Sequence, residues 1–296
     1  MIVRVGQEAR EALAEGRPVV ALESTIISHG LPRPDNLRIA REIEQTVREH
    51  GAVPATVGMV EGELIIGLDD GELTRLAMGD DVAKLSVRDL GIAAVLKRDG
   101  ATTVASTGAA AAIAGIRVFA TGGLGGVHRE AFDESADLVT LARTRLIVVC
   151  AGVKSILDIG ATLERLETLG VGVVGYGTDR FPGFFIGDSG FGVDWRLDSP
   201  EEVARAFKAQ VAQGVSGAAL VVANPLPEEE QLDPALHDRV LAEGLSIVER
   251  DNVTGKRVTP VLLRHFHSAT HGASLAANVR IILRNAALAA QIAAAL

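Results

Sequence analysis

Short apolar runs alternate along the chain with longer segments whose apolar residues recur at helical spacing. The short runs are rich in Val, Ile and Leu, and they predict strands at 17–23, 52–59, 63–67, 116–121, 145–150, 171–176 and 218–223. The longer segments predict helices at 36–50, 102–115, 154–170, 200–213 and 274–296. We expect Asn36 to cap the first of these helices and Gly115 to end the second.

The order of these elements indicates the fold class. Strand, helix and strand in succession favour parallel pairing with helices on both faces of the sheet. We therefore predict a three-layer α/β/α fold around a central, mainly parallel or mixed sheet. The glycine- and proline-rich interruptions at 177–194 and 224–234 have the length of ordinary loops, and the chain carries no low-complexity linker. Residues 1–296 are accordingly predicted to form a single catalytic domain.

Composition excludes several classes of protein. Of the 296 residues, 48% are hydrophobic and 23% are charged, which is typical of a globular chain. A net charge of −9 without a basic stripe argues against nucleic-acid binding, and the single cysteine, Cys150, excludes an intramolecular disulfide. Residues 1–18 predict an amphipathic helix and not a signal peptide, and no apolar run reaches the ~18 residues of a membrane span. We expect a cytoplasmic protein without membrane or nucleic-acid partners.

The ends of the predicted strands hold the reactive residue types. Parallel α/β sheets bind ligands outside the carboxyl ends of their strands. The segments that follow the predicted strands are 23–30, 121–128, 150–155 and 224–225. The turn at 121–128 is rich in glycine, so its backbone amides either cradle a phosphate or simply connect two elements. We expect a ligand site where these segments meet.

Lysine is scarce in this chain, because five of the 29 basic residues are lysine and the rest are arginine. Arginine replaces lysine as a surface cation but not as an amine nucleophile. Lys154 follows a fully apolar strand and opens the helix predicted at 154–170, so burial and the helix dipole both favour its neutral amine. A solvent-exposed lysine in the first helical turn is the alternative. A phosphate-binding P-loop is excluded, because Val153 stands where that motif requires glycine.

Two groups of carboxylates are further candidates for chemistry. Glu23 ends the first apolar strand, where its carboxyl group is either a general acid or base, or a cap or arginine partner. Asp133, Glu134 and Asp137 lie within five residues of one another. Oxygen ligands at this density suit Mg²⁺ or Mn²⁺, but they are also common in the first turn of a helix.

Eight strings make this sequence similar to the pseudouridine-5′-phosphate glycosidase family. Each is several residues long, and they follow one another in a single order from near the N-terminus to the last predicted helix. The strings are ALESTIISHGLP (21–32), AKLSVRDL (83–90), GATTVA (100–105), ATGGLGGVHR (120–129), FDESADL (132–138), VVCAGVKSILD (148–158), LVVANPLP (220–227) and SLAANV (274–279).

The resemblance implies an activity, a metal and an assembly. Members of the family cleave pseudouridine 5′-phosphate to uracil and ribose 5-phosphate, and the reverse reaction is favoured chemically. They use a divalent metal, typically Mn²⁺, and form homotrimers with an α/β/α core. By position, the resemblance makes Lys154 the nucleophile and Glu23 the proton donor, and it places the metal on Asp133. It assigns substrate contacts to Lys84, Val104, Ser135, Ala136, Asp137 and Asn278.

The bond that the family breaks explains these residue types. Pseudouridine joins base to sugar by a carbon–carbon bond, so it has no glycosidic oxygen for the paired carboxylates of ordinary glycosidases to protonate. Opening of the ribose ring lets a lysine amine trap C1 as an iminium, which is an electron sink for breaking the bond to the base. In this hypothesis Glu23 protonates the ring oxygen, while Lys84 and backbone amides hold the phosphate.

Three other functions are alternatives at this point. A Schiff-base lyase acting on another sugar phosphate or C-nucleoside would use the same residues. A carbohydrate kinase would need an ATP-phosphate loop, for which the sequence offers no convincing candidate. A non-catalytic protein that binds a nucleoside phosphate would have no use for Lys154 and Glu23 at strand ends.

Two features fall outside the resemblance. The span from Arg129 to Phe132 is shorter than in many members, so we expect the loop leading to the metal site to differ. His265, His267 and His271 belong to no family string, and they lack the carboxylate or cysteine pattern of a zinc site. We expect these histidines at the surface or at an interface.

Overall fold

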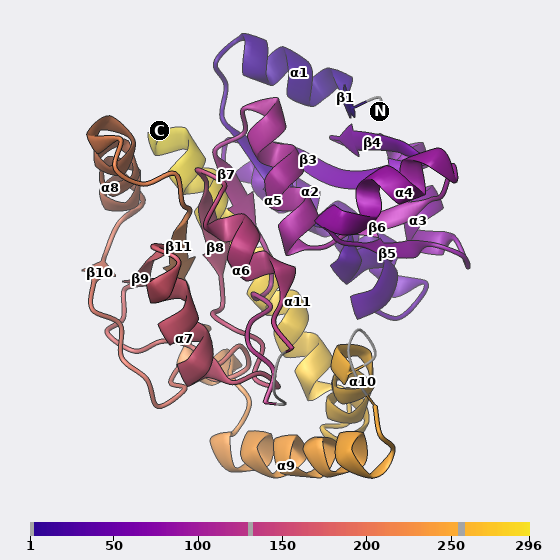
Figure 1. Ribbon diagram of the computed structural model, residues 1–296, viewed down its shortest axis with the longest axis vertical. Helices are drawn as coiled ribbons and strands as arrows, with labels where there is room; N and C mark the ends of the chain where they lie inside the picture. Colours follow the sequence, from indigo (N-terminus) through magenta and orange to yellow (C-terminus); the bar gives the residue numbers. More distant parts are fainter. Residues whose placement is uncertain (1–2, 130–132, 254–257) are drawn as a thin grey trace.

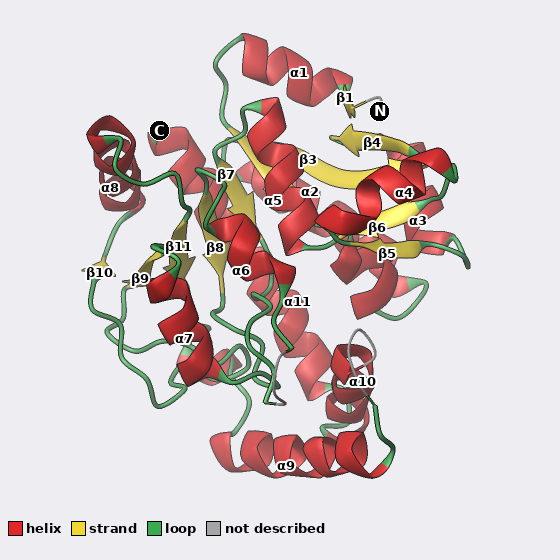
Figure 2. Cartoon of the chain, in the orientation of Figure 1, coloured by secondary structure: helices red, strands yellow, loops and turns green. Residues whose placement is uncertain are grey.

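A central sheet is covered by helices on both faces, so the predicted three-layer α/β/α architecture is confirmed (Figures 1 and 2). The computed structural model describes residues 3–129, 133–253 and 258–296. The strands are β1 (Val3–Val5), β2 (Val19–Leu22), β3 (Val53–Val60), β4 (Glu63–Ile66), β5 (Ala83–Leu85), β6 (Gly100–Thr102), β7 (Val118–Ala120), β8 (Ile147–Cys150), β9 (Gly172–Tyr176), β10 (Arg196–Leu197) and β11 (Leu220–Ala223).

The helices surround this sheet and also extend beyond one end of it. They are α1 (Gln7–Ala14), α2 (Asp35–Glu49), α3 (Asp70–Met78), α4 (Leu90–Val95), α5 (Val104–Ala114), α6 (Ala136–Leu141), α7 (Ile159–Thr168), α8 (Pro200–Gln213), α9 (Pro234–Arg250), α10 (Val258–Ala269) and α11 (Ala273–Ala295). A π-helical turn, η1 (Ile26–Gly30), and two 3₁₀ turns, η2 (Val87–Asp89) and η3 (Glu228–Glu230), complete the elements. None of the helices described is long and apolar enough to cross a bilayer.

The sheet is parallel through its centre and mixed at one side. Its order is β1-β4-β3-β2-β7-β8-β11-β9-β10, with β6 pairing with both β3 and β5. Every pair from β3 to β10 along this order is parallel, whereas β3 is antiparallel to β4 and to β6. Leu22 is level with Ala120, and Ala120 with Val149, so β2, β7 and β8 finish at one edge.

Two apolar cores lie on opposite sides of the sheet. Alternate residues of a strand face opposite ways, so Val20 belongs to the core under α2, α8 and α11, while Val19 belongs to the core under α1, α5, α6 and α7. Strands buried on both faces carry continuous apolar runs, which explains why the sequence pattern found them. Figure 1 shows α11 running diagonally behind the sheet, from beside α10 to the C-terminus near α8.

The structure corrects four local predictions. Residues 3–5 form the strand β1, so the amphipathic helix begins only at Gln7. The helix predicted at 154–170 begins at Ile159, behind its cap Asp158. Asn36 lies inside α2 and does not cap it, because its side-chain amide donates to the carbonyl oxygens of two other segments. Within 224–234, which was expected to be loop, η3 forms, and the helices α9 and α10 follow.

Candidate active site

Lys154 lies on a buried turn between β8 and α7. Gly152 makes this turn possible: its φ is +78°, and a Cβ there would lie 2.1 Å from the carbonyl oxygen of Pro182. The backbone N–H of Lys154 donates to Leu124 at 3.2 Å, and the Ser155 hydroxyl donates to the Gly183 carbonyl at 2.9 Å. The prediction that Lys154 opens a helix is therefore wrong, and the argument from the helix dipole does not apply to it.

Glu23 is a buried carboxyl group that follows β2 directly. Its side chain is 8% exposed and accepts a hydrogen bond from the hydroxyl of Thr121, which follows β7. Burial raises the pKa of Glu23 above its ordinary value, although the charge of Lys154 and the Thr121 hydroxyl act in the opposite direction. A raised pKa favours the protonated form of the carboxyl group, which is the form that can donate a proton.

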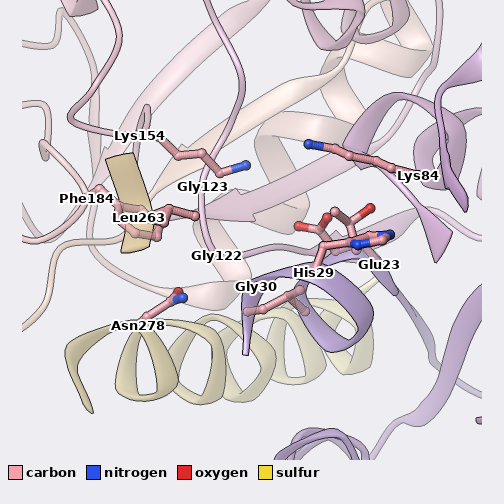
Figure 3. Close-up of a pocket in the computed structure, with 12 residues that line it drawn as sticks. Glu23, His29, Gly30, Lys84, Gly122, Gly123, Lys154, Phe184, Leu263 and Asn278 are labelled. Atoms are coloured by element: carbon pink, nitrogen blue, oxygen red, sulfur yellow. The ribbon is translucent and has the colours of Figure 1, made fainter. Parts of the chain in front are cut away.

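Lys154, Glu23 and Lys84 converge on one cavity. Figure 3 shows the ammonium groups of Lys154 and Lys84 pointing toward one another from opposite sides, with the Glu23 carboxyl group close to the Lys84 side. The cavity has two lobes, and these three residues together with Thr25 line both of them. The junction of the lobes therefore holds two lysine side chains and a buried carboxyl group.

The smaller lobe, which we name the apolar lobe, encloses about 550 Å³. Its walls are the side chains of Ile26, Phe184 and Leu263 and the backbone of Gly122 and Gly123. The side chains of Asn278, from the start of α11, and His29, from η1, also line it.

The larger lobe, which we name the polar lobe, encloses about 1190 Å³. Six of the predicted site residues line this lobe together. They are Lys84, Val104, Asp133, Ser135, Ala136 and Asp137. Val104 is the first residue of α5 and Ala136 the first of α6, so two helix N-termini face this lobe. The structure thus brings all nine predicted site residues to one cavity.

Asp137 joins three segments around the polar lobe. One of its carboxylate oxygens accepts the N–H of Ala105 at 2.9 Å, and the other accepts the N–H of Gly125 at 2.8 Å. Its own N–H donates to the Ser135 hydroxyl, which caps α6. Asp137 therefore holds the start of α5 and the glycine-rich turn in place, besides lining the lobe.

Asp133 offers an exposed carboxylate for a divalent ion. Its side chain is 40% exposed, and one of its oxygens lies 3.9 Å from Nδ1 of His128. Glu134 lines the same lobe, and its carboxylate is paired with Arg165 at 3.1 Å. Within the described ranges no group of three or more His, Cys, Asp or Glu side chains could hold a metal. These donors fit a Mg²⁺- or Mn²⁺-type ion that keeps most of its waters, and they do not fit an all-protein cage.

Some expectations concern residues outside this cavity or outside the described ranges. The short span leading to Asp133 includes residues 130–132, which the structure does not describe. His267 and His271 are exposed, as expected. His265 is half-buried between α10 and α9, where Nε2 lies 3.5 Å from Glu243.

Sequence reasoning missed Phe184 and Leu263, which line the cavity, and Thr121, whose hydroxyl donates to the Glu23 carboxyl group behind it. Phe184 lies in the interruption at 177–194, and Leu263 lies on α10, which no pattern predicted. Thr121 opens a glycine-rich segment that had already been singled out, so the position was found but its hydroxyl was not.

The chain matches one known protein family over nearly its whole length. A family model described as indigoidine synthase A like protein matches residues 8–295. The chain belongs to this family. The indigoidine synthase A-like family includes curated relatives named pseudouridine-5′-phosphate glycosidase, so the recognition made from the eight strings is confirmed.

Three of these relatives cover nearly all of the chain. The glycosidase of Salinispora tropica is 74% identical over 99% of this chain and 91% of its own. That of Symbiobacterium thermophilum is 54% identical over 98% and 96%, and that of Geobacillus kaustophilus is 50% identical over 97% and 96%.

Two solved structures share the fold of this family member. The prealnumycin C-glycosynthase AlnA, in complex with ribulose 5-phosphate, superposes with a TM-score of 0.91 at 38% identity, over 100% of this chain and 97% of its own. An indigoidine synthase A-like protein from Thermotoga maritima superposes with a TM-score of 0.90 at 35% identity, over 99% and 96%.

Proposed function

We propose that this chain is a pseudouridine-5′-phosphate glycosidase, which reversibly cleaves the carbon–carbon bond between uracil and ribose 5-phosphate. The observation that carries the proposal is the meeting of Lys154, Lys84 and Glu23 at the junction of the two lobes (Figure 3). Cleavage of a C-glycoside needs an amine to trap C1′ and an acid to protonate the departing ring oxygen. The full-length similarity to glycosidases of this name supports the same substrate.

The two lobes fit the two halves of the substrate. The apolar lobe has the walls and the single amide, that of Asn278, that suit a flat pyrimidine. The polar lobe has room for an opened ribose chain, with Lys84 and the amides at the start of α5 beside Val104 to hold its phosphate. Ser135, Ala136 and Asp137 line the same lobe, and in this proposal they contact the sugar hydroxyls.

The reaction divides into balanced steps. Nζ of Lys154 bonds to C1′ as the C1′–O4′ bond breaks, and Glu23 gives its proton to O4′. The ammonium formed at Nζ gives one proton to the Glu23 carboxylate, which frees the nitrogen lone pair. The lone pair then forms a C1′=N iminium while the C1′–C5 bond breaks, the electron pair of that bond stays on C5 of the uracil, and C5 takes up the proton from Glu23. Water adds to the iminium and releases ribose 5-phosphate and the free amine. Synthesis runs through the same iminium, which C5 of uracil attacks.

The proposal includes a divalent ion, for which Mn²⁺ is the first choice. Asp133 would hold it at the edge of the polar lobe, with His128 nearby. Such an ion supplies positive charge and ordered waters beside a phosphorylated substrate. Stimulation of turnover by Mn²⁺ is expected to disappear in Asp133→Ala.

The proposal also places the enzyme in the cytoplasm as a homotrimer. Phosphorylated nucleosides are charged and stay inside cells, which favours that compartment. A stripe of exposed apolar side chains on α4 and at its end, formed by Ile92, Val95 and Leu96, supplies a surface for another copy of the chain.

Borohydride trapping tests the function directly. Wild-type protein incubated with ribose 5-phosphate and then reduced should carry a stable adduct, which peptide mapping places on Lys154. Lys154→Arg keeps the charge but not the nucleophile, so we expect no adduct and a loss of uracil release from pseudouridine 5′-phosphate of at least about 10³-fold.

The matched control is Lys208→Arg, since Lys208 lies on the surface of α8 and only donates to the Ala295 carbonyl. It should leave both readouts unchanged. An adduct on another lysine, or Lys154→Arg turnover within tenfold of wild type, would overturn the proposal. Trapping without any condensation with uracil would favour a lyase that acts on a different sugar phosphate.

A further inference from the structure

The backbone of Phe184 is unusual for a phenylalanine. Its φ is +65°, in the left-handed region that disfavours residues with a Cβ and that glycine occupies freely. Residues held in this region cluster at ligand sites, where the surrounding structure compensates their cost. Here the N–H of Phe184 donates to the Ala151 carbonyl at 3.0 Å, which ties the residue to the turn that carries Lys154.

The ring of Phe184 fills a place that two glycines leave open. A Cβ on Gly123 would lie 2.6 Å from Cδ2 of Phe184, and a Cβ on Gly122 would lie 3.6 Å from its Cε2. The same Gly122 position is 3.6 Å from the Asn278 amide oxygen. The Thr-Gly-Gly sequence therefore lets an aromatic ring and an amide approach the same turn at the wall of the apolar lobe.

Behind this wall, the Phe184 ring packs against further aromatic rings. Phe184 meets Phe185 edge-on at 4.7 Å, and Phe185 stacks on Phe266 of α10 at 5.3 Å. α10 also carries Leu263, which lines the same lobe. Phe184 is thus a well-packed part of the wall, and among the residues described it is the phenylalanine that lines the apolar lobe, beside the imidazole of His29.

We propose that Phe184 is a specificity-determining residue that holds the pyrimidine ring of uracil by stacking in the apolar lobe. This inference rests on the proposed function. Stacking suits every flat base, and Asn278 adds the polar contact that distinguishes one from another. The strained backbone is retained because a glycine at this position would supply no ring.

The test separates the base from the sugar. Phe184→Leu keeps most of the apolar volume but removes the ring, so in the synthetic direction we expect the KM for uracil to rise about tenfold or more. The KM for ribose 5-phosphate and borohydride trapping with ribose 5-phosphate alone should stay within about twofold of wild type. Phe207→Leu is the matched control, because it removes a buried ring on α8 that does not line the cavity, and it should leave the KM for uracil unchanged.

A second variant tests the same proposal in case Phe184→Leu does not fold. Gly123→Ala places a methyl group against the ring and should raise the KM for uracil in the same way, whereas Gly91→Ala, with open space around it, should not. A KM for uracil within twofold of wild type in Phe184→Leu would overturn the proposal. So would a joint loss of trapping and uracil binding, since Phe184 would then act by supporting the Lys154 turn. Wild-type protein that shows no trapping contradicts the proposed function instead.

Discussion

The Glu23 carboxyl group is buried near two lysine amines, and burial affects its pKa more strongly than the two amines do. The direction of its pKa shift is upward, because loss of water penalises the carboxylate more than Lys154, Thr121 and Lys84 stabilise it. Burial therefore favours the protonated carboxyl group that the proposed role of Glu23 as proton donor requires. Its neighbour Lys154 reaches the same point from β8, so acid and nucleophile belong to separate strands of one rigid sheet.

The raised pKa of Glu23 predicts a pH effect on stability. The folded protein binds this proton more tightly than the unfolded chain, so the free energy of unfolding falls as pH rises from about 4.5 through the raised pKa. Glu23→Gln cannot ionise, and its stability relative to wild type should increase over that range by up to about 1.4 kcal/mol per pH unit. Urea unfolding of both proteins at several pH values measures this difference. A difference that does not change with pH would show that Glu23 ionises normally.

At the scale of elements, short turns hold the site together. Asp137, in the first turn of α6, accepts N–H groups from the start of α5 and from the glycine-rich turn after β7. The side chain is buried, so water cannot replace these two hydrogen bonds when the carboxylate is removed.

Asp137→Ala should therefore cost both stability and activity. Two buried N–H groups lose their acceptor, at about 1–3 kcal/mol each, so we expect the free energy of unfolding to fall by about 2–5 kcal/mol. Ser135→Ala is the comparison, since it removes only the cap of α6 and should cost about 1 kcal/mol. Denaturant titration of the three proteins gives these values. Equal stability of the two variants would mean that the carboxylate does not join the segments.

The hydrophobic patterns of the sequence predicted the strands of the sheet, but they did not predict the residues that form the walls of the cavity. The central strands were found to within a few residues, because burial on both faces leaves uninterrupted Val, Ile and Leu runs. The segment after β8 was misjudged: Ile156 and Leu157 are buried in a turn, and their spacing next to α7 imitated a longer helix. A local pattern cannot express the tertiary contacts that fix Gly152 against Pro182.

The candidate site was predictable in part and for an identifiable reason. The reactive side chains follow strands or open helices, so topology alone placed Glu23 and Lys154 at one edge. Asp133 and Asp137 were singled out by their density along the chain. Phe184 and Leu263 come from segments with no signature of their own, since an apolar wall requires shape and not a particular sequence.

At the scale of the whole molecule, one group of neighbouring apolar side chains is exposed to solvent. On α4 and at its end, Ile92, Val95 and Leu96 are 63%, 82% and 63% exposed and lie at the i, i+3 and i+4 positions of one face. Three such side chains on one short helix are typical of a contact with another copy, and they lie just after η2, whose Arg88 lines the polar lobe. The proposed trimer would thus form beside the substrate site.

Val95→Glu tests this surface. A buried charge at the interface should lower the assembly from three times the 30.9 kDa chain mass to the mass of one chain, as measured by sedimentation. Val215→Glu introduces the same change at a side chain that is 91% exposed in the turn after α8, and it should leave the mass unaltered. If both variants keep the wild-type mass, α4 is not the contact.

The division of the cavity at Lys154 has an evolutionary consequence. In the proposed function, the covalent step takes place at the junction and the sugar phosphate is held in the polar lobe, while the apolar side chains of the other lobe select the carbon nucleophile. On this proposal, substitutions in the apolar lobe change which carbon nucleophile the enzyme uses, while the reaction at Lys154 stays the same. Such an evolutionary change is consistent with the similarity between this chain and a C-glycosynthase whose structure was solved with ribulose 5-phosphate.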